Sequence, residues 1–81
     1  MIQTVLKRDG RVVGFNEEKI ATAIRKAMLH TDKGEDLQLI HQITDRISFK
    51  GDSQMTVEAI QDLVEVELMK SSRKDVAQKY I

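Results

Sequence analysis

The sequence has 81 residues and contains no cysteine, no proline and no tryptophan. Without cysteine the chain can form no disulfide, no zinc–thiolate site and no thiol nucleophile, so these classes of stabilisation and chemistry are excluded. It also lacks an apolar run of about 20 residues, the length that a membrane-spanning helix needs, and shows no secretory signal. We therefore expect a cytoplasmic location and no membrane contact.

The chain also lacks an excess of charge of either sign, because 13 Lys and Arg residues balance 13 Asp and Glu residues. General nucleic-acid binders are usually basic, so no nucleic-acid partner is expected. Hydrophobic residues make up 41% of the chain and charged residues 32%. This composition is typical of a folded domain and not of a disordered segment.

Groups that could perform catalysis or hold a metal ion are sparse. The two histidines, His30 and His41, are far apart in the sequence and have no obvious carboxylate or thiol partner. The sequence has no ligand spacing typical of a zinc or calcium site, and no glycine-rich phosphate loop of the Walker or dinucleotide type. We therefore predict no catalytic residue and no metal site, and expect a binding function instead.

Residues 2–15 have the pattern of a β-hairpin. Asp9-Gly10 is a strong signal for a two-residue type I′ turn, in which both central residues have positive φ. This turn would place Val5 opposite Gly14. Because side chains alternate between the faces of a strand, the pairing assigns each residue to a face. The predicted faces are Val5, Lys7 and Val12 on one side, and Leu6, Val13 and Phe15 on the other.

Four helical patterns follow this hairpin. Asn16 is a suitable N-cap for a helix that begins at Glu17, and Gly34 is a plausible stop. A second helix is predicted over about residues 36–49. The apolar stripes predicted to face the core in these two helices are Ile20, Ala23, Ile24, Ala27 and Met28 in the first, and Leu37, Ile40, Ile43 and Ile47 in the second.

The second half of the chain is predicted to add a short strand and two more helices. Met55 lies in the predicted third strand, and Thr56 caps the third helix. The helical pattern breaks at Ser71-Ser72, and a fourth helix follows. The apolar positions predicted to face the core are Val57, Ile60, Leu63, Val64 and Leu68 in the third helix, and Val76, Ala77 and Tyr80 in the fourth.

These elements predict an α+β fold in a single domain of residues 1–81, with a hairpin followed by four short helices. The last residues, 76–81, still follow a helical pattern and carry no stop signal. We therefore expect the chain to be a fragment of a longer protein.

The basic residues around the predicted turn are the most informative feature. Lys7, Arg8 and Arg11 flank the turn, and Lys19 lies in the first turn of the next helix, where the helix dipole disfavours a cation. A bound anion would reverse that cost and satisfy free backbone N–H groups. An alternative stays open, in which these residues are ordinary charged surface groups in contact with water and bind no ligand. The apolar Val5 beside Lys7 favours a nucleotide, which combines an apolar base with phosphates.

Several short segments match those of a known family, namely residues 5–10, Phe15, Lys19-Ile20, 57–65 and 76–80. On these segments the sequence resembles the ATP-cone domain family, and the resemblance runs from near residue 3 to the end of the chain. ATP-cones regulate ribonucleotide reductases by binding ATP or dATP, and also occur in a repressor of reductase genes. The resemblance implies a hairpin that forms a lid over a four-helix bundle. It also implies a regulatory domain that is not itself an enzyme.

The resemblance further implies roles for individual residues. Lys7, Arg8 and Lys19 would bind phosphate groups. Gln61 stands where some reductase cones carry a histidine and would complete the phosphate contacts. The residues implied beside the base or ribose are Val5, Val12, Asn16, Ile20 and Val57. The effector would be ATP or dATP, with Mg²⁺ accompanying the nucleotide.

Among possible parent proteins, the sequence most resembles the N-terminal regulatory domain of an anaerobic ribonucleoside-triphosphate reductase, a glycyl-radical enzyme. The expected partners are adenine nucleotides, the catalytic domain of the parent chain, and other copies of the chain in nucleotide-dependent contacts. Two alternatives stay open. One is the ATP-cone of a nucleotide-sensing transcriptional repressor, and the other is a helical protein-interaction module that binds no nucleotide.

Overall fold

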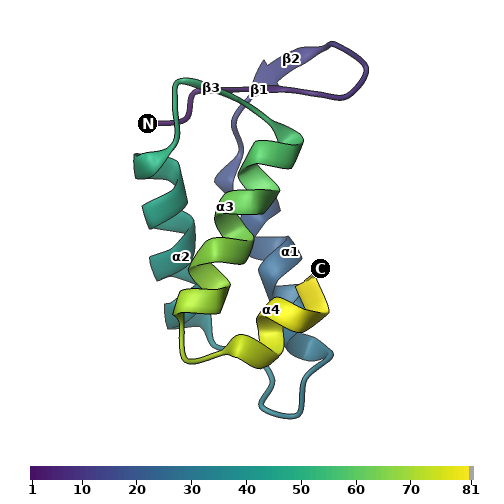
Figure 1. Cartoon of the computed structure of the whole chain (residues 1–81), viewed down its shortest axis with the longest axis vertical. Helices are drawn as coiled ribbons and strands as arrows, with labels where there is room; N and C mark the ends of the chain where they lie inside the picture. The colour runs from purple at the N-terminus through teal and green to yellow at the C-terminus, as the bar shows by residue number, and fades with distance from the viewer. Residues whose placement is uncertain (81) are drawn as a thin grey trace.

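The computed structural model describes residues 1–80 of the chain. The elements in these residues are β1 (Thr4–Leu6), β2 (Val12–Gly14), α1 (Glu17–Leu29), α2 (Leu37–Lys50), β3 (Gln54–Thr56), α3 (Val57–Lys70) and α4 (Lys74–Tyr80). The strands form one small sheet that lies across one end of the helices (Figure 1). The predicted α+β fold, with a hairpin that covers one end of a four-helix bundle, is therefore confirmed.

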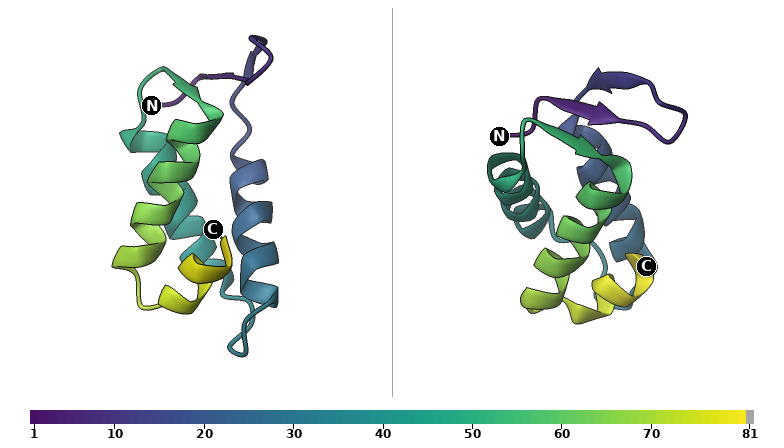
Figure 2. Two further views of the ribbon diagram at one scale, coloured as in Figure 1. Left: turned by 45° about the vertical axis from the view of Figure 1, so that its right-hand side comes forward. Right: turned by 45° about the horizontal axis from the view of Figure 1, so that its top comes forward.

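Strand β1 is the centre of the sheet. It pairs antiparallel with β2 and parallel with β3, which gives the strand order β2-β1-β3. Figure 2 shows the three strands side by side across the end of the bundle. The predicted strand near Met55 is confirmed as β3. It leads directly into α3, because Thr56 ends the strand and caps the helix, where its Oγ1 accepts a hydrogen bond from the Ala59 N–H at 3.1 Å.

The hairpin loop has three residues, and not the two that were predicted. The carbonyl of Lys7 accepts a hydrogen bond from the Gly10 N–H at 2.9 Å, and the Lys7 N–H donates to the Arg11 carbonyl at 2.8 Å. Gly10 has a φ of 89°, while no non-glycine residue in the described chain has a positive φ. A type I′ turn would need positive φ at Asp9 as well, so that prediction is wrong. A tight turn followed by one left-handed glycine is the common form of a three-residue hairpin loop.

The extra loop residue shifts the strand pairing by one position. Val5 lies opposite Val13, one residue away from its predicted partner. A shift of one residue exchanges the faces of one strand relative to the other. Val13 and Phe15 therefore share a face with Val5 and Lys7. The predicted placement of Val12 on that face is wrong, and Val12 is 54% exposed on the opposite face.

The helices begin and end close to the predicted positions. Asn16, Asp36 and Thr56 are N-caps, and each side chain accepts a backbone N–H of the following turn. Helix α1 ends with His30 as its C-cap, so the predicted stop at Gly34 lies in the loop that follows. None of the helices within residues 1–80 combines the length and the apolar character needed to cross a bilayer.

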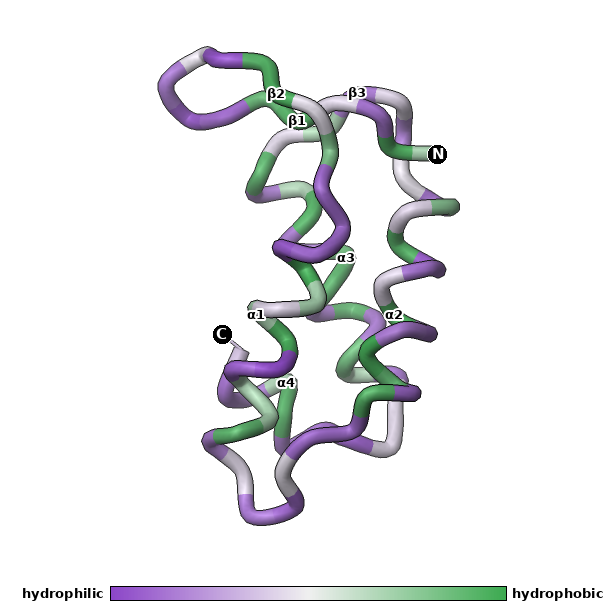
Figure 3. Tube along the Cα trace, turned by 180° about the vertical axis from the view of Figure 1, so that it is seen from behind, coloured by the Kyte–Doolittle hydropathy of each residue, from purple (hydrophilic) through white to green (hydrophobic). Residues whose placement is uncertain are grey.

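The core lies between the four helices, because α1 and α3 each pack against both α2 and α4. Leu37 is an exception to the predicted stripes. As the first residue of α2 it lies at the end of the bundle and is 56% exposed. Figure 3 shows that hydrophilic residues gather on the hairpin loop and on the loop between α1 and α2, at opposite ends of the molecule. The buried apolar residues are Ile2, Ile20, Ile24, Ala27, Met28, Ile40, Ile43, Ile47, Ile60, Val64, Leu68, Val76 and Ala77.

Close packing at Gly51 joins the sheet to α2. A Cβ atom at this position would lie 2.6 Å from the sulfur of Met55 and would overlap the side chain of Ile2. Ile2 is only 4% exposed, and its N–H donates to the Ser48 carbonyl at 2.9 Å. The glycine that ends α2 therefore also makes room for the segment that leads into β1.

Candidate functional site

A cavity of about 290 Å³ lies between the sheet and helices α1, α3 and α4. Its volume is close to the lower end of the range of ligand-binding cavities, which is about 300–1,000 Å³. Its walls come from the hairpin and the start of α1, which follow each other in the sequence, and from α3 and α4, which are distant from them in the sequence. The lining residues are Val5, Lys7, Val13, Gly14, Phe15, Asn16, Lys19, Ile20, Ala23, Val57, Ile60, Gln61 and Tyr80.

The structure brings most of the predicted site residues together in this cavity. Those that line it are Val5, Lys7, Asn16, Lys19, Ile20, Val57 and Gln61. Arg8 and Val12 are not among its lining residues: Arg8 lies beside an adjoining recess, and Val12 faces away on β2. The role of each residue in binding a ligand stays a prediction.

Sequence reasoning missed several apolar walls of the cavity. Val13 and Phe15 were assigned to the other face of the hairpin, because the loop was read as two residues long. A three-residue loop with Gly10 in the left-handed position would have placed both on the cavity face. Tyr80 was assigned to the core, whereas it is half-buried and forms a wall from α4.

The two lysines of the cavity have no carboxylate partner among the residues that the structure describes. Lys7 comes from the hairpin and Lys19 from α1, and neither forms an ion pair with another residue between 1 and 80. The described residues that line the cavity include no Asp or Glu. The cavity therefore combines two available ammonium groups with mostly apolar walls, which suits a ligand that has both an anionic and an apolar part.

The start of α1 forms a polar edge of the cavity. The Oδ1 of Asn16 accepts a hydrogen bond from the Glu18 N–H at 3.0 Å, which caps the helix. Asn16 and Lys19 are three residues apart, so their side chains lie on the same side of the first turn and both reach the cavity. The backbone dipole at this end of the helix favours an anion beside Lys19.

A recess of about 280 Å³ continues from the cavity toward the hairpin loop. It is lined by Lys7, Arg8, Asp9 and Val57, and Lys7 and Val57 also line the cavity. Beside it, the Nε of Arg8 donates to the Oε1 of Glu58 at 2.5 Å. The backbone N–H of Glu58, at the start of α3, lowers the pKa of this carboxyl, and the hydrogen bond from Arg8 lowers it further.

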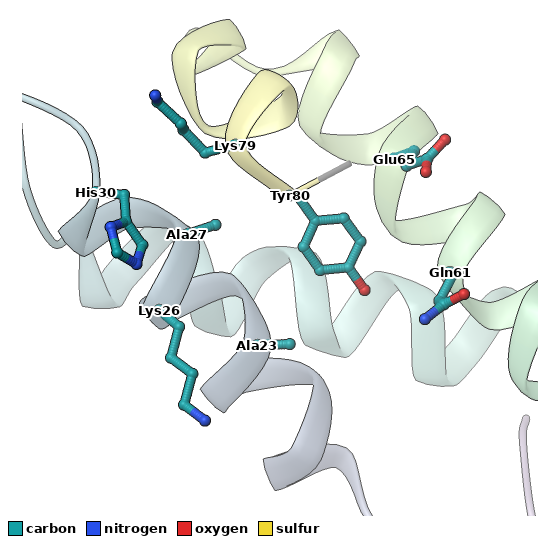
Figure 4. Close-up of a pocket in the computed structure, with 8 residues that line it drawn as sticks. All are labelled: Ala23, Lys26, Ala27, His30, Gln61, Glu65, Lys79 and Tyr80. Carbon is teal, nitrogen blue, oxygen red and sulfur yellow. The ribbon is translucent and has the colours of Figure 1, made fainter.

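A larger cavity of about 420 Å³ shares Ala23, Gln61 and Tyr80 with the first one, and Figure 4 shows the residues that line it. Its lining residues are Ala23, Lys26, Ala27, His30, Gln61, Glu65, Lys79 and Tyr80. Figure 4 shows the Tyr80 ring between α1 and α3. Burial raises the pKa of the Tyr80 phenol, and the charge of Glu65 adds to this effect. Tyr80 therefore forms a wall shared by both cavities.

No group of three or more acidic or histidine side chains that could hold a metal ion occurs within residues 1–80. The histidine that lines a cavity, His30, faces the larger one, and His41 is exposed on α2.

The chain is similar to known proteins over nearly its whole length. The ATP cone domain family matches residues 3–81. The chain is 42% identical over 88 residues to the vitamin B12-dependent ribonucleoside-diphosphate reductase of Thermoplasma acidophilum, a match that covers 100% of this chain and 11% of that protein. It is 35% identical over 91 residues to the alpha subunit of ribonucleoside-diphosphate reductase from Chlamydia pneumoniae, covering 99% of this chain and 9% of that protein.

The alpha subunit from Chlamydia trachomatis is also 35% identical over 91 residues, with 96% of this chain and 9% of that protein covered. The chain therefore spans about a tenth of the length of the curated relatives that it matches.

Proposed function

The chain belongs to the ATP-cone domain family, and from this premise we propose that it is an allosteric domain that binds ATP or dATP in the cavity beneath the hairpin. One observation carries the proposal. Lys7 and Lys19, neither of them paired with an acid of the described chain, stand in a cavity whose other walls are mostly apolar. A nucleotide presents phosphates to the lysines and a base to the apolar walls.

In this proposal the nucleotide lies between the hairpin and the first turns of α1 and α3. Lys7 and Lys19 bind the phosphates, and Arg8 reaches them from the recess. Asn16 and Gln61 provide hydrogen-bonding groups for phosphate or ribose. The apolar residues that we place beside the base and ribose are Val5, Ile20 and Val57, and we add Val13, Phe15 and Tyr80 because they line the same cavity. Mg²⁺, which proteins commonly bind through the phosphates of a nucleotide, accompanies the ligand.

The enzyme that this domain controls is a ribonucleotide reductase in our proposal, with the domain forming one part of a longer chain. The support is that the relatives are reductases in which a sequence like this one makes up about a tenth of the protein. Their names favour a ribonucleoside-diphosphate reductase. The anaerobic, glycyl-radical ribonucleoside-triphosphate reductase predicted from the sequence stays an alternative that these relatives do not support.

Regulation requires that the two effectors differ in affinity for two states of the enzyme. We expect dATP to favour a state in which the domain docks on the catalytic part of the chain or on another copy, and ATP to release it. The lysines cannot make this distinction, because ATP and dATP carry the same phosphates. The ribose and its surroundings must therefore decide it.

Calorimetric titration of the chain with ATP and with dATP tests the proposal. We expect saturable binding, and Lys7→Ala should weaken it by at least about tenfold, because a charge-assisted hydrogen bond contributes about 1.5–3 kcal/mol. Lys33→Ala, at an exposed lysine of the loop between α1 and α2, is the matched control and should leave affinity unchanged. Equal losses in both variants would place the site elsewhere. A complete lack of nucleotide binding would favour the helical protein-interaction module.

A further inference from the structure

An ion pair connects the hairpin loop to the first turn of α3. The Nε of Arg8 lies 2.5 Å from the Oε1 of Glu58. Figure 1 shows the hairpin loop reaching out above the start of α3. Each partner follows a residue that lines both the cavity and the recess, since Arg8 follows Lys7 and Glu58 follows Val57. The ion pair therefore stands beside the recess into which the cavity continues.

This ion pair is open to exchange. The side chains of Arg8 and Glu58 are 73% and 53% exposed. Exposed ion pairs contribute little to folding, because water and dissolved ions compete for both partners. The start of α3 stabilises the ionised carboxylate of Glu58, so the negative charge is present at neutral pH. Glu58 therefore binds Arg8, but this ion pair contributes little to the stability of the fold.

The other cations of the hairpin differ from Arg8 in their partners. Arg11 is paired with Asp9 inside the same loop, at 2.7 Å, and this contact would not change when the loop moves as a unit. Lys7 has no ion pair with a described residue. Arg8 is therefore the hairpin cation whose availability depends on another element of the fold.

We propose that Glu58 is an internal competitor for Arg8: without nucleotide its carboxylate accepts the hydrogen bond from the Arg8 Nε, and a polyphosphate that extends from Lys7 into the recess displaces it. The inference rests on the proposed function. A triphosphate reaches Arg8 and competes with the carboxylate for it, whereas a monophosphate held at the lysines does not reach it. Displacement also breaks the ion pair between the hairpin loop and α3. Glu58 therefore makes the domain respond to the length of the phosphate chain.

A double-mutant cycle with two probe nucleotides, ATP and AMP, tests this inference by calorimetry. Glu58→Gln should tighten ATP binding about two- to fivefold, the range that exposed ion pairs support, and leave AMP binding unchanged. In the Arg8→Ala background the same substitution should give no gain, because the contested cation is absent. Asp62→Asn, one turn further along α3, removes the same charge and is the matched control; it should not tighten ATP binding.

The outcomes separate the inference from the proposed function. ATP binding that is unchanged or weakened by Glu58→Gln overturns the inference alone. An equal gain in both backgrounds, or the same gain from Asp62→Asn, also overturns it, because the effect would then be a general one of charge. If the unaltered chain binds neither ATP nor dATP, the proposed function fails and this inference falls with it. Unfolding midpoints of all variants should match that of the unaltered chain.

Discussion

The two ends of the bundle each use an arginine to join elements that are distant in the sequence, and they use it in different ways. At the sheet end, the Arg8 side chain is 73% exposed and has one carboxylate partner on α3. At the opposite end, the Arg73 side chain is 9% exposed. It donates to the Thr31 hydroxyl at 3.0 Å, to the Gly34 carbonyl at 2.9 Å and to the Asp75 carboxylate at 3.1 Å.

Burial decides which role an arginine can have: a buried arginine stabilises the fold, and an exposed one is available to a ligand. Arg73 ties the loop between α1 and α2 to the start of α4, and its partners are parts of the folded chain that it cannot exchange for a solute. Losing it would leave partly buried acceptors on both elements without this donor. Arg8 can exchange its exposed partner for a phosphate at little cost.

The largest expected effect on stability comes from removing the buried side chain of Arg73. Arg73→Ala should lower the free energy of unfolding by about 1–3 kcal/mol, because partly buried acceptors lose their donor. Thermal unfolding measures this as a midpoint lower by about 4–8 °C for each kcal/mol. Arg46→Ala, at an exposed arginine on α2, is the control and should have almost no effect. If both variants unfold alike, the structural role of Arg73 is wrong.

Substitution of a cavity lysine at the sheet end should change the affinity for ATP and not the stability of the fold. Lys19→Ala should weaken ATP binding about tenfold, because the phosphates lose a charge-assisted contact. Its unfolding midpoint should stay the same or rise slightly, since a cation is removed from the positive end of α1. Calorimetry and thermal unfolding measure the two quantities on one sample. Lys70→Ala, at an exposed lysine in the last turn of α3, should leave affinity unchanged.

Unfolding midpoints measured over a range of pH test the contribution of the hydrogen bond between Arg73 and Asp75. The hydrogen bond from Arg73 holds the pKa of Asp75 below its usual value of 3.8. Because the pKa is lower in the folded state, the ionised carboxylate stabilises the fold above about pH 4 and loses this contribution as the pH falls through the folded pKa. Asp75→Asn should therefore lower the unfolding midpoint at pH 7, with a difference that shrinks toward pH 3. A difference that is constant with pH would contradict this explanation.

The smallest expected effect on stability is that of Arg8→Ala. Its partner is exposed, so the unfolding midpoint should equal that of the unaltered chain within experimental error. ATP affinity should nevertheless fall, because the phosphates lose the guanidinium. A clear loss of stability would contradict the difference between the two arginines, since Arg8 would then stabilise the fold as Arg73 does.

Features that depend on neighbouring residues were predictable. The caps Asn16 and Thr56 are confirmed, because a cap needs only its own side chain and the next turn of backbone. The register of the hairpin was not, because two- and three-residue loops compete closely and the choice depends on φ at Asp9. The one additional residue in the loop decides whether Val12 or Val13 faces the cavity.

By itself, the sequence determined the helices, their caps and the α+β pattern, because periodicity and local hydrogen bonds act over a few residues. It also identified Lys7 and Lys19 as cations beside apolar positions. Only the tertiary structure decided that these lysines line one cavity to which residues 1–80 contribute no acid, that Tyr80 is a shared wall, and that Arg73 is buried. Such contacts join residues from distant parts of the chain, and no local pattern records which side chains will meet.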